Sequence, residues 1–366
     1  MSPESSADLY ARLRASGRLP IRHAPSLDVH PVGAPLAWDR VEGMLLGLAI
    51  GDALGNTSES VVPADRLLSL GEVRDYQPNR TMGRRRLGTP SDDSQMAFWT
   101  LEQALEHGAL DVERLARVFA SRHIVGIGQT VSAFRLAIQA GDAWEDAGVR
   151  SAGNGALMRI APVLVPHVAT PSNALWRDVV LASKLTHHDT ASVASCVAFV
   201  HVLWQALQLT TPPSPDWWSD TFLTVLDDLC LDDVYRPRGG TVDSGGRFPD
   251  LVRTGLERAR RERWNTQTAC SQFFSSAYLL ETVPCVLWIL EQHAADPEEA
   301  IVRAVNDTYD NDTIAAIVGA AVGALHGADR LPQRWRDGLT GRTASHDDGR
   351  IQALIAEARH RFWETA

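Results

Sequence analysis

Three aspartates lie within six positions in the stretch NDTYDNDTIAAIVGAAVGALHG, residues 306 to 327. Asp307, Asp310 and Asp312 repel one another unless a helix N-terminus or a bound cation offsets their charge. Asp310, Asp312 and the following Thr313 would supply three hard oxygen atoms at the start of an apolar helical run. Such oxygens suit Mg²⁺, Mn²⁺ or Ca²⁺ better than zinc or copper. Asp307 is expected to be a bystander.

A second acidic cluster, Ser-Asp-Asp-Ser at residues 91 to 94, opens another expected helix. Either cluster alone is explained most simply by helix capping, in which Ser and Asp side chains accept bonds from orphan backbone N–H groups. One aspartate is enough for a cap, which contributes about 1 kcal/mol. Together with Asp52 and Glu59 in GDALGNTSE, the two clusters favour a divalent-metal site over capping alone.

The stretch SAGNGALMR places Gly153 and Gly155 on either side of Asn154, directly before an apolar run. Glycine-rich turns that enter a helix expose N–H groups able to cradle a diphosphate, but the same pattern also occurs in ordinary turns. His187, in LTHHDTA, can likewise be read as a satisfied buried histidine or as a pocket residue. Both alternatives stay open on the residues alone.

The composition excludes several classes of protein. A net charge of −10 over 366 residues argues against non-specific binding to a phosphate backbone. The four scattered cysteines form no CxxC pair, so neither a zinc cage nor a disulfide framework is indicated. The polar N-terminus lacks the apolar segment of a signal peptide, and we expect a cytoplasmic protein.

Helical periodicity dominates the chain, which predicts a compact all-α fold of many helices. A glycine recurs every fourth residue from Gly43 to Gly55 and again from Gly319 to Gly327. Repeated glycines on one helix face are explained if another backbone approaches closely there. Further helices are expected at 95–107, 111–121, 131–140, 192–209, 218–229, 250–264, 273–293, 297–305 and 350–365.

Residues 1–37 are expected to form an N-terminal extension to the domain of residues 38–366. Ser6 is a candidate cap for a short helix carrying Leu9 and Leu13, and several prolines follow. The extension is interpreted either as an arm that is disordered or packs on the domain, or as an arm that binds a partner.

Five motifs in order resemble those of the ADP-ribosylglycohydrolase family, which includes dinitrogenase-reductase-activating glycohydrolase and the ADP-ribosylarginine hydrolases. They are GMLLGLAIGDALGNTSE, SDDSQM, SAGNGALMRIAPVL, LTHHDTA and VNDTYDNDTIAAIVGAAVGALHG, and the resemblance covers roughly residues 40 to 330. It implies an all-α domain with two Mg²⁺ or Mn²⁺ ions in a cleft, which cleaves ADP-ribose from a modified acceptor.

The resemblance also implies roles for individual residues. Glu59 and Asp92 are implied as candidate catalytic carboxylates. The implied metal ligands are Ser91, Asp92, Asp93, Asp310, Asp312 and Thr313. The residues implied to bind ADP-ribose are Ser151, Gly153, Asn154, Gly155 and His187, with Tyr309 at the pocket rim.

The chain departs from the family pattern at three positions. Ser91 replaces a threonine and keeps the oxygen ligand, and Asn311 stands where threonine is common. Thr308 and Tyr309 replace the usual pair of glycines. Two larger residues at that place are expected to reshape the pocket rim and to affect acceptor preference more than metal binding.

The function expected from these motifs is a metal-dependent hydrolase of ADP-ribosylated proteins, in the first place of ADP-ribosylarginine. Breaking a ribosyl C–N bond builds positive charge at the anomeric carbon, which carboxylates can stabilise. An immunity protein that reverses an ADP-ribosyltransferase toxin is one form of this hypothesis.

Two alternatives remain. One is an ADP-ribose-binding protein whose extension blocks a toxin's active site. The other is a hydrolase for serine, O-acetyl-ADP-ribose or nucleic-acid adducts, with specificity set by Tyr309 and the glycine-rich loop at 239–246.

Overall fold

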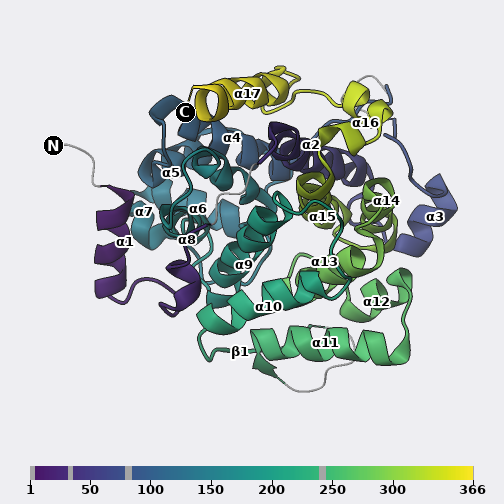
Figure 1. Ribbon diagram of the computed structural model, residues 1–366, viewed down its shortest axis with the longest axis horizontal. Coiled ribbons are helices and arrows are strands. Elements are labelled where there is room, and N and C mark those ends of the chain that lie inside the picture. Colours follow the sequence, from purple (N-terminus) through teal and green to yellow (C-terminus); the bar gives the residue numbers. More distant parts are fainter. Residues whose placement is uncertain (1–4, 32–35, 79–84, 239–244, 366) are drawn as a thin grey trace.

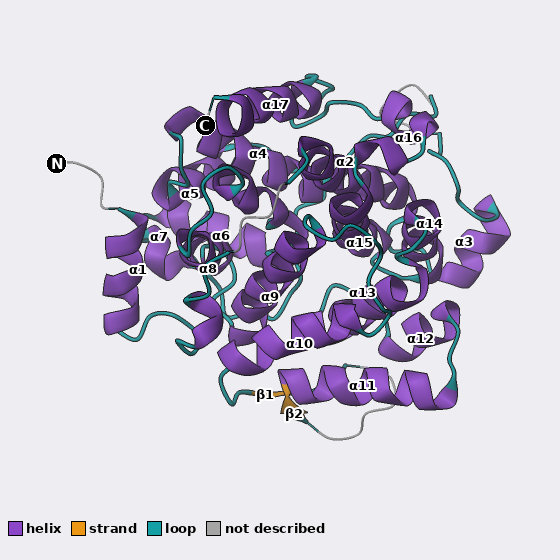
Figure 2. Cartoon of the chain, viewed as in Figure 1, coloured by secondary structure: helices purple, strands orange, loops and turns teal. Residues whose placement is uncertain are grey.

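The computed structural model describes residues 5–31, 36–78, 85–238 and 245–365. Its regular structure is almost entirely helical, which confirms the predicted all-α fold (Figure 1, Figure 2). Within these ranges the only strands are β1 (Val234–Tyr235) and β2 (Gly246–Arg247), which form a short antiparallel pair. None of the described helices combines the length and apolar character needed to cross a bilayer.

The α-helices have the following bounds: α1 Ser6–Ala15, α2 Trp38–Gly55, α3 Pro63–Leu70, α4 Asp92–His107, α5 Val112–Ser121, α6 Gln129–Ala140, α7 Trp144–Ala147, α8 Ala174–Lys184, α9 Thr190–Ala206, α10 Trp217–Leu229, α11 Phe248–Glu262, α12 Thr266–Phe273, α13 Leu279–His293, α14 Pro297–Asp307, α15 Asn311–His326, α16 Gln333–Gly338 and α17 Arg350–Arg359.

Helices α2 and α15 run antiparallel with their backbones in direct contact (Figure 1). The predicted glycine ladders face each other along this contact. A Cβ added at Gly47 would lie 2.7 Å from the carbonyl carbon of Gly319 and closer still to its oxygen. At the far end, a Cβ at Gly55 would lie 2.5 Å from the backbone nitrogen of Asp312. The pair therefore brings the C-terminal end of α2 against the N-terminus of α15.

One hydrophobic core surrounds this helix pair. Helices α9 and α13 are buried along most of their length, and both pack against α15. Helix α4 packs against α2 and α15, and α14 leads into α15. The N-termini of α4 and α15, which carry the two acidic clusters, consequently meet beside the end of α2.

Two expectations about helix boundaries are wrong. The helix expected at 273–293 is interrupted, because Phe274 and Ser275 have left-handed backbones with φ of 75° and 42°. The carbonyl of Ser275 accepts a hydrogen bond from the backbone of Asp310 (2.9 Å), a tertiary contact that local periodicity does not encode. At the N-terminus, Ser5 rather than Ser6 caps α1, by accepting a bond from the Asp8 N–H. Helices α3, α7, α8, α12 and α16 were not predicted.

The described part of the N-terminal segment packs on the rest of the chain. Helix α1 lies against α8, with Leu9, Tyr10 and Leu13 buried in the common core. The carbonyl of Val29 accepts a hydrogen bond from the Trp176 indole (2.7 Å). Ion pairs join Arg12 and Arg18 to Glu145. These contacts hold the described part of the segment against the rest of the chain. That a partner binds the segment stays a prediction.

We expect Leu13→Ala to lower the free energy of unfolding by about 2–5 kcal/mol, the usual cost of removing a fully buried leucine side chain. The matched control is Leu68→Ala on α3, because Leu68 is 86% exposed and its loss leaves no cavity. Chemical denaturation of both variants measures the difference. Equal stability of the two variants would contradict the view that α1 is an integral part of the fold.

Candidate active site

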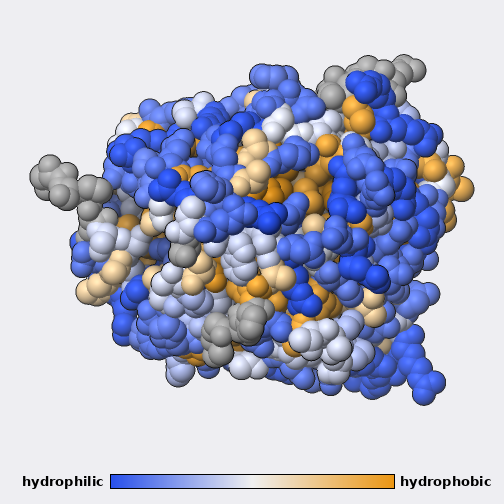
Figure 3. Space-filling view, turned by 45° about the horizontal axis from the view of Figure 1, so that its top comes forward, coloured by the Kyte–Doolittle hydropathy of each residue, from blue (hydrophilic) through white to orange (hydrophobic). Residues whose placement is uncertain are grey.

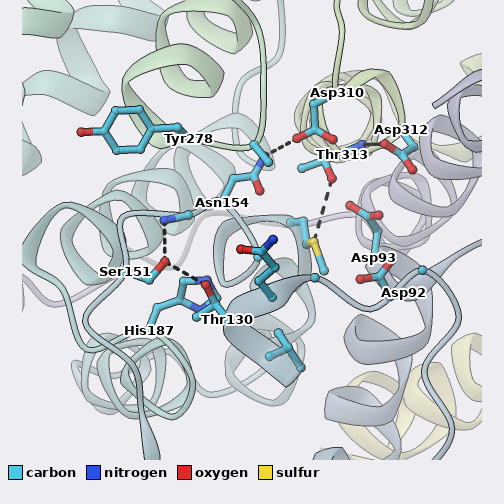
Figure 4. A pocket seen from close by; sticks show the side chains of 18 of the residues that line it. Asp92, Asp93, Thr130, Ser151, Asn154, His187, Tyr278, Asp310, Asp312 and Thr313 are labelled. Carbon is cyan, nitrogen blue, oxygen red and sulfur yellow. Dashed lines mark hydrogen bonds between the residues drawn. The ribbon is translucent and has the colours of Figure 1, made fainter. Parts of the chain in front are cut away.

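A cavity of about 450 Å³ opens where the N-termini of α4 and α15 meet (Figure 4). Its acidic wall is formed by Glu59, Asp92, Asp93, Asp310 and Asp312. Opposite lies a wall of turns, which is formed by Gly126, Gly128, Thr130, Ser151, Gly153, Asn154, Gly155 and His187. Tyr278 and Arg238 also line it. The cavity thus pairs clustered carboxylates with glycine-rich backbone.

Asp52 on α2 caps the N-terminus of α4 from outside that helix. Its fully buried carboxylate accepts bonds from the backbone N–H groups of Ser91 (2.9 Å) and Ser94 (3.0 Å) and from both serine hydroxyls. Ser91 occupies the N-cap position of α4, but its own side chain accepts no hydrogen bond from the first turn of that helix. Because Asp52 does the capping, Asp92 and Asp93 are not needed for it.

The carboxylates form two overlapping groups. Ligand oxygens of Asp52, Asp93 and Asp312 lie within 4.8 Å of one another, and so do those of Glu59, Asp310 and Asp312. Asp312 belongs to both groups. The Oδ1 atom of Asp93 is buried and has no hydrogen-bond partner. A buried, unpartnered anionic oxygen among like charges is unfavourable unless a cation binds there, so the residues present fit divalent metal ions.

Burial dominates the electrostatics of this wall. It raises the pKa of Asp93 and of Asp312 well above the usual range, and the neighbouring carboxylates raise each further. Burial also raises the pKa of Asp310 to about 6. The pKa of Glu59 is raised by burial first, and then by Asp310 and Asp52. Hard cations would offset the repulsion that these shifts reflect.

The wall of turns is held in place by hydrogen bonds (Figure 4). The Asn154 amide donates to Asp310 Oδ2 (2.6 Å) and to the Thr282 hydroxyl (3.0 Å), which links this wall to the acidic one. The Ser151 hydroxyl accepts from the Gly153 N–H (3.2 Å) and lies 2.9 Å from the Thr130 hydroxyl. The turn is therefore fixed at a set distance from the carboxylates.

His187 is neutral and buried behind the glycines. Burial, and secondly the nearby Arg159, lowers its pKa to about 3. Its Nδ1 atom lies 2.8 Å from the Thr186 hydroxyl. A Cβ at Gly155 would approach the imidazole ring to 3.1 Å, so larger residues would crowd the ring there. His187 can accordingly form hydrogen bonds but carries no positive charge.

Most of the residues expected in the site line one cavity, and two do not. Glu59, the aspartates 92, 93, 310 and 312, Thr313, Ser151, the 153–155 turn and His187 all line it. Ser91 is bonded to Asp52 (2.7 Å) and is not among the lining residues. Tyr309 lines a neighbouring cavity instead. The implied roles of all these residues, whether or not they line the cavity, stay predictions.

Sequence reasoning missed Arg66, which joins the segment carrying Glu59 to the segment before Asp310. The fully buried guanidinium donates to the carbonyls of Ser58 (3.2 Å), Val61 (2.8 Å) and Thr308 (2.9 Å). Its burial lowers its pKa to about 10. Nothing in the local stretch PADRLLSL signals this role, because all three acceptors are backbone atoms outside that stretch.

The chain matches one family model and several known proteins. Residues 34–365 match the family model described as ADP-ribosylglycohydrolase. The chain is 28% identical to ADP-ribosylarginine hydrolase Tri1 of Pseudomonas putida, over 82% of this chain and 74% of that protein. It is 25% identical to ADP-ribosyl-[dinitrogen reductase] glycohydrolase of Rhodospirillum rubrum, over 88% of this chain and 98% of that protein.

A less similar protein and a solved structure also match this chain. ADP-ribosylhydrolase ARH3 of Bos taurus is 24% identical, over 91% of this chain and 95% of that protein. A solved structure titled ADP-ribosylglycohydrolase-related protein complex superimposes with a TM-score of 0.57 at 22% identity, over 88% of this chain and 98% of that one. The structural likeness concerns the fold alone.

Proposed function

Because this chain belongs to the ADP-ribosylglycohydrolase family, we propose that it hydrolyses the bond between ADP-ribose and a protein side chain, in the first place arginine. The observation that carries the proposal is the pairing of two carboxylate groups, which share Asp312, with a glycine-rich turn in one cavity. The turn suits a diphosphate, and the carboxylates suit divalent cations beside a ribose.

Bound Mg²⁺ or Mn²⁺ would orient the ribose hydroxyls and lower the pKa of a water molecule. The residues to hold the ions are Asp92, Asp93, Asp310, Asp312 and Thr313, with Ser91 as a further proposed ligand. Of these residues, Asp93, Asp310 and Asp312 belong to the two overlapping carboxylate groups, each of which could hold one ion.

The remaining chemistry falls to the protein's own groups. The water oxygen attacks the anomeric carbon, and Glu59 or Asp92 accepts its proton. Glu59 is a candidate for the base because its carboxylate lines the cavity and lies in one group with Asp310 and Asp312. The electrons of the C–N bond leave with the guanidine nitrogen, which takes up one proton in exchange for the one that the water gives to the carboxylate. The surrounding carboxylates stabilise the positive charge that develops on the ribose.

Arginine is proposed as the acceptor for two reasons. Tri1 is named as an ADP-ribosylarginine hydrolase, and it is among the relatives that match most of this chain. In addition, a departing guanidinium is cationic, and Glu59 and Asp310 lie on the acidic wall where it would form. The same acidic wall and the net charge of −10 weigh against a nucleic-acid acceptor.

A toxin-blocking role for residues 1–37 has no support in the described contacts. The apolar residues that could have formed a docking face, Leu9, Tyr10 and Leu13, are buried in the chain's own core. Helix α1 is thereby explained without a partner. Hydrolysis is the function that the buried carboxylates favour over simple binding of ADP-ribose, because a binder gains nothing from like charges held together.

The test is release of ADP-ribose, measured by chromatography from arginine-modified protein, serine-modified protein and O-acetyl-ADP-ribose. We expect release from the arginine-modified protein with Mg²⁺ or Mn²⁺, loss of release with EDTA, and recovery when the metal is restored. Release that persists in EDTA after dialysis would contradict the metal-dependent mechanism. Release from none of the substrates would contradict the hydrolase proposal, and preference for another adduct would contradict arginine.

A further inference from the structure

A second cavity, of about 850 Å³, adjoins the candidate active site. Three chain segments pass from one cavity to the other. Glu59 lines the first cavity and Val62 the second, Asp310 lines the first and Tyr309 the second, and Ala277 lines the first while Ser276 lines the second. Arg238 lines both. The two cavities therefore share a rim, and Glu59 and Asp310 stand on it.

We propose that this second cavity binds the polypeptide that carries the modified side chain. The inference rests on the proposed hydrolase function and names the class of its acceptor: a protein segment rather than a free amino acid or another small compound.

The order of the substrate's parts, from diphosphate through ribose to acceptor, supports this assignment. The glycine-rich turn around Asn154 lies on the side of the first cavity that suits the diphosphate. The carboxylates suit the ribose that bears the bond to be broken. The acceptor must then continue past the ribose, away from the diphosphate. Glu59 and Asp310 stand on the shared rim, so an acceptor bonded to a ribose beside these carboxylates can pass over the rim into the second cavity.

The lining of the second cavity has the chemistry of a peptide site. Phe274 is 52% exposed and Tyr309 is 37% exposed, and both offer aromatic faces to apolar or cationic side chains. Helix α12 contributes amide and hydroxyl groups that can pair with peptide backbone, namely those of Gln267, Thr268, Ser271 and Gln272. Aromatic residues and arginine are enriched in protein-recognition surfaces, and this lining also contains Arg238 and the carboxylate of Asp307.

A strained turn joins this cavity to the carboxylates. Phe274 and Ser275 are both left-handed, a conformation that persists at non-glycine residues only where the surroundings impose it. The Ser275 hydroxyl accepts from the Tyr309 N–H (3.0 Å), and its carbonyl accepts from the Asp310 N–H (2.9 Å). One turn thus places Phe274 in the second cavity and holds the backbone of the acidic wall.

The neighbouring surface also suits a macromolecule. Val62, Pro63 and Ala64 at the start of α3 line the cavity. The same helix exposes Leu67 (55%) and Leu68 (86%) to solvent. Figure 3 shows a small group of apolar side chains at the right-hand edge of the molecule, on the side where α3 lies in Figure 1, and further apolar areas near the centre of the same face. Exposed apolar groups beside a site are a mark of protein interaction.

The test compares two substrates with one variant, Thr268→Arg, which puts a bulky side chain into the second cavity from an exposed position on α12. The small substrate is free ADP-ribosylarginine, and the large one is an arginine-modified polypeptide. We expect kcat/KM for the polypeptide to fall by about tenfold or more, mainly through KM, while kcat/KM for the small substrate changes by less than about twofold.

The control is Thr254→Arg, which places the same side chain on the exposed part of α11, outside the cavity lining. It should leave both substrates unaffected. If Thr268→Arg melts at a lower temperature than the wild-type protein, Gln272→Arg serves as the second variant. Equal loss on both substrates, or no loss on the polypeptide, would overturn the proposal.

The same assay distinguishes an error in the proposed hydrolase function from an error in the proposed acceptor site. Wild-type protein that releases ADP-ribose from neither substrate would overturn the hydrolase function, and the acceptor site with it. Wild-type release from both substrates, with no selective effect of the variant, would leave the hydrolase standing and overturn the acceptor site alone.

Discussion

Replacing Asp312 by asparagine is expected to lower kcat/KM for release of ADP-ribose by about 10²–10³-fold. Asp312 is the one carboxylate common to both groups of the acidic wall, so its charge serves both proposed ion positions. The asparagine keeps the shape and an oxygen but removes the negative charge that a divalent cation needs. A bound ion contributes several kcal/mol of transition-state stabilisation, and each 1.36 kcal/mol is a factor of ten in rate.

Metal binding provides an independent readout for the same variant. Saturating Mn²⁺ should raise the melting temperature of the wild-type protein, because an ion that binds only the folded state stabilises it by about 2.7 kcal/mol at a hundred times its Kd. The shift should be reduced or lost in Asp312→Asn. The control is Asp142→Asn, which removes an exposed carboxylate just after α6 and should leave activity and metal response unchanged. An active Asp312→Asn variant with a normal metal response would refute the proposed centre.

Replacing Gly47 by alanine is expected to be strongly destabilising, because the added methyl group would point into the facing backbone of α15. The new Cβ would overlap the carbonyl group of Gly319, well inside the 3.0 Å limit that real Cβ atoms respect. Both partners are backbone, so no side chain can rotate away. We expect a loss of about 3 kcal/mol or more, since overpacking costs about 1–3 kcal/mol even where neighbours can adjust. The helix propensity of alanine recovers only about 1 kcal/mol of this.

The effect should reach the active site, because the same contact sets Asp52 and Asp312 side by side. Denaturation measures the stability of Gly47→Ala, and the metal-induced shift in melting temperature measures the carboxylate geometry. Gly128→Ala is the matched control: its added Cβ would meet nothing within 4 Å, and its loss of stability should stay below about 1 kcal/mol. Similar stabilities for the two variants would show that the helices separate more easily than the backbone contact implies.

Much of the scaffold could be predicted from local pattern. The glycines spaced four apart predicted two helices that approach another backbone, and the structure shows that each is the other's partner. The break at Phe274 could not be predicted, because it depends on a bond between Ser275 and Asp310, far apart in the chain. For the same reason Arg66 gave no signal: the carbonyl of Thr308, which it binds, lies more than two hundred residues away.

The sequence by itself determined the chemistry available to this protein: which carboxylates, hydroxyls and glycines exist, and on which helix ends they stand. Residue type and spacing are local properties, so Asp92, Asp93, Asp310 and Asp312 could be singled out without coordinates. Only the tertiary structure decided which of them meet and which are needed for capping. Asp52 satisfies the α4 N-terminus from another helix, and that leaves Asp93 with a buried, unpartnered oxygen. The backbone contact of α2 with α15 is what brings these groups within a few ångströms, and no local pattern contains that distance.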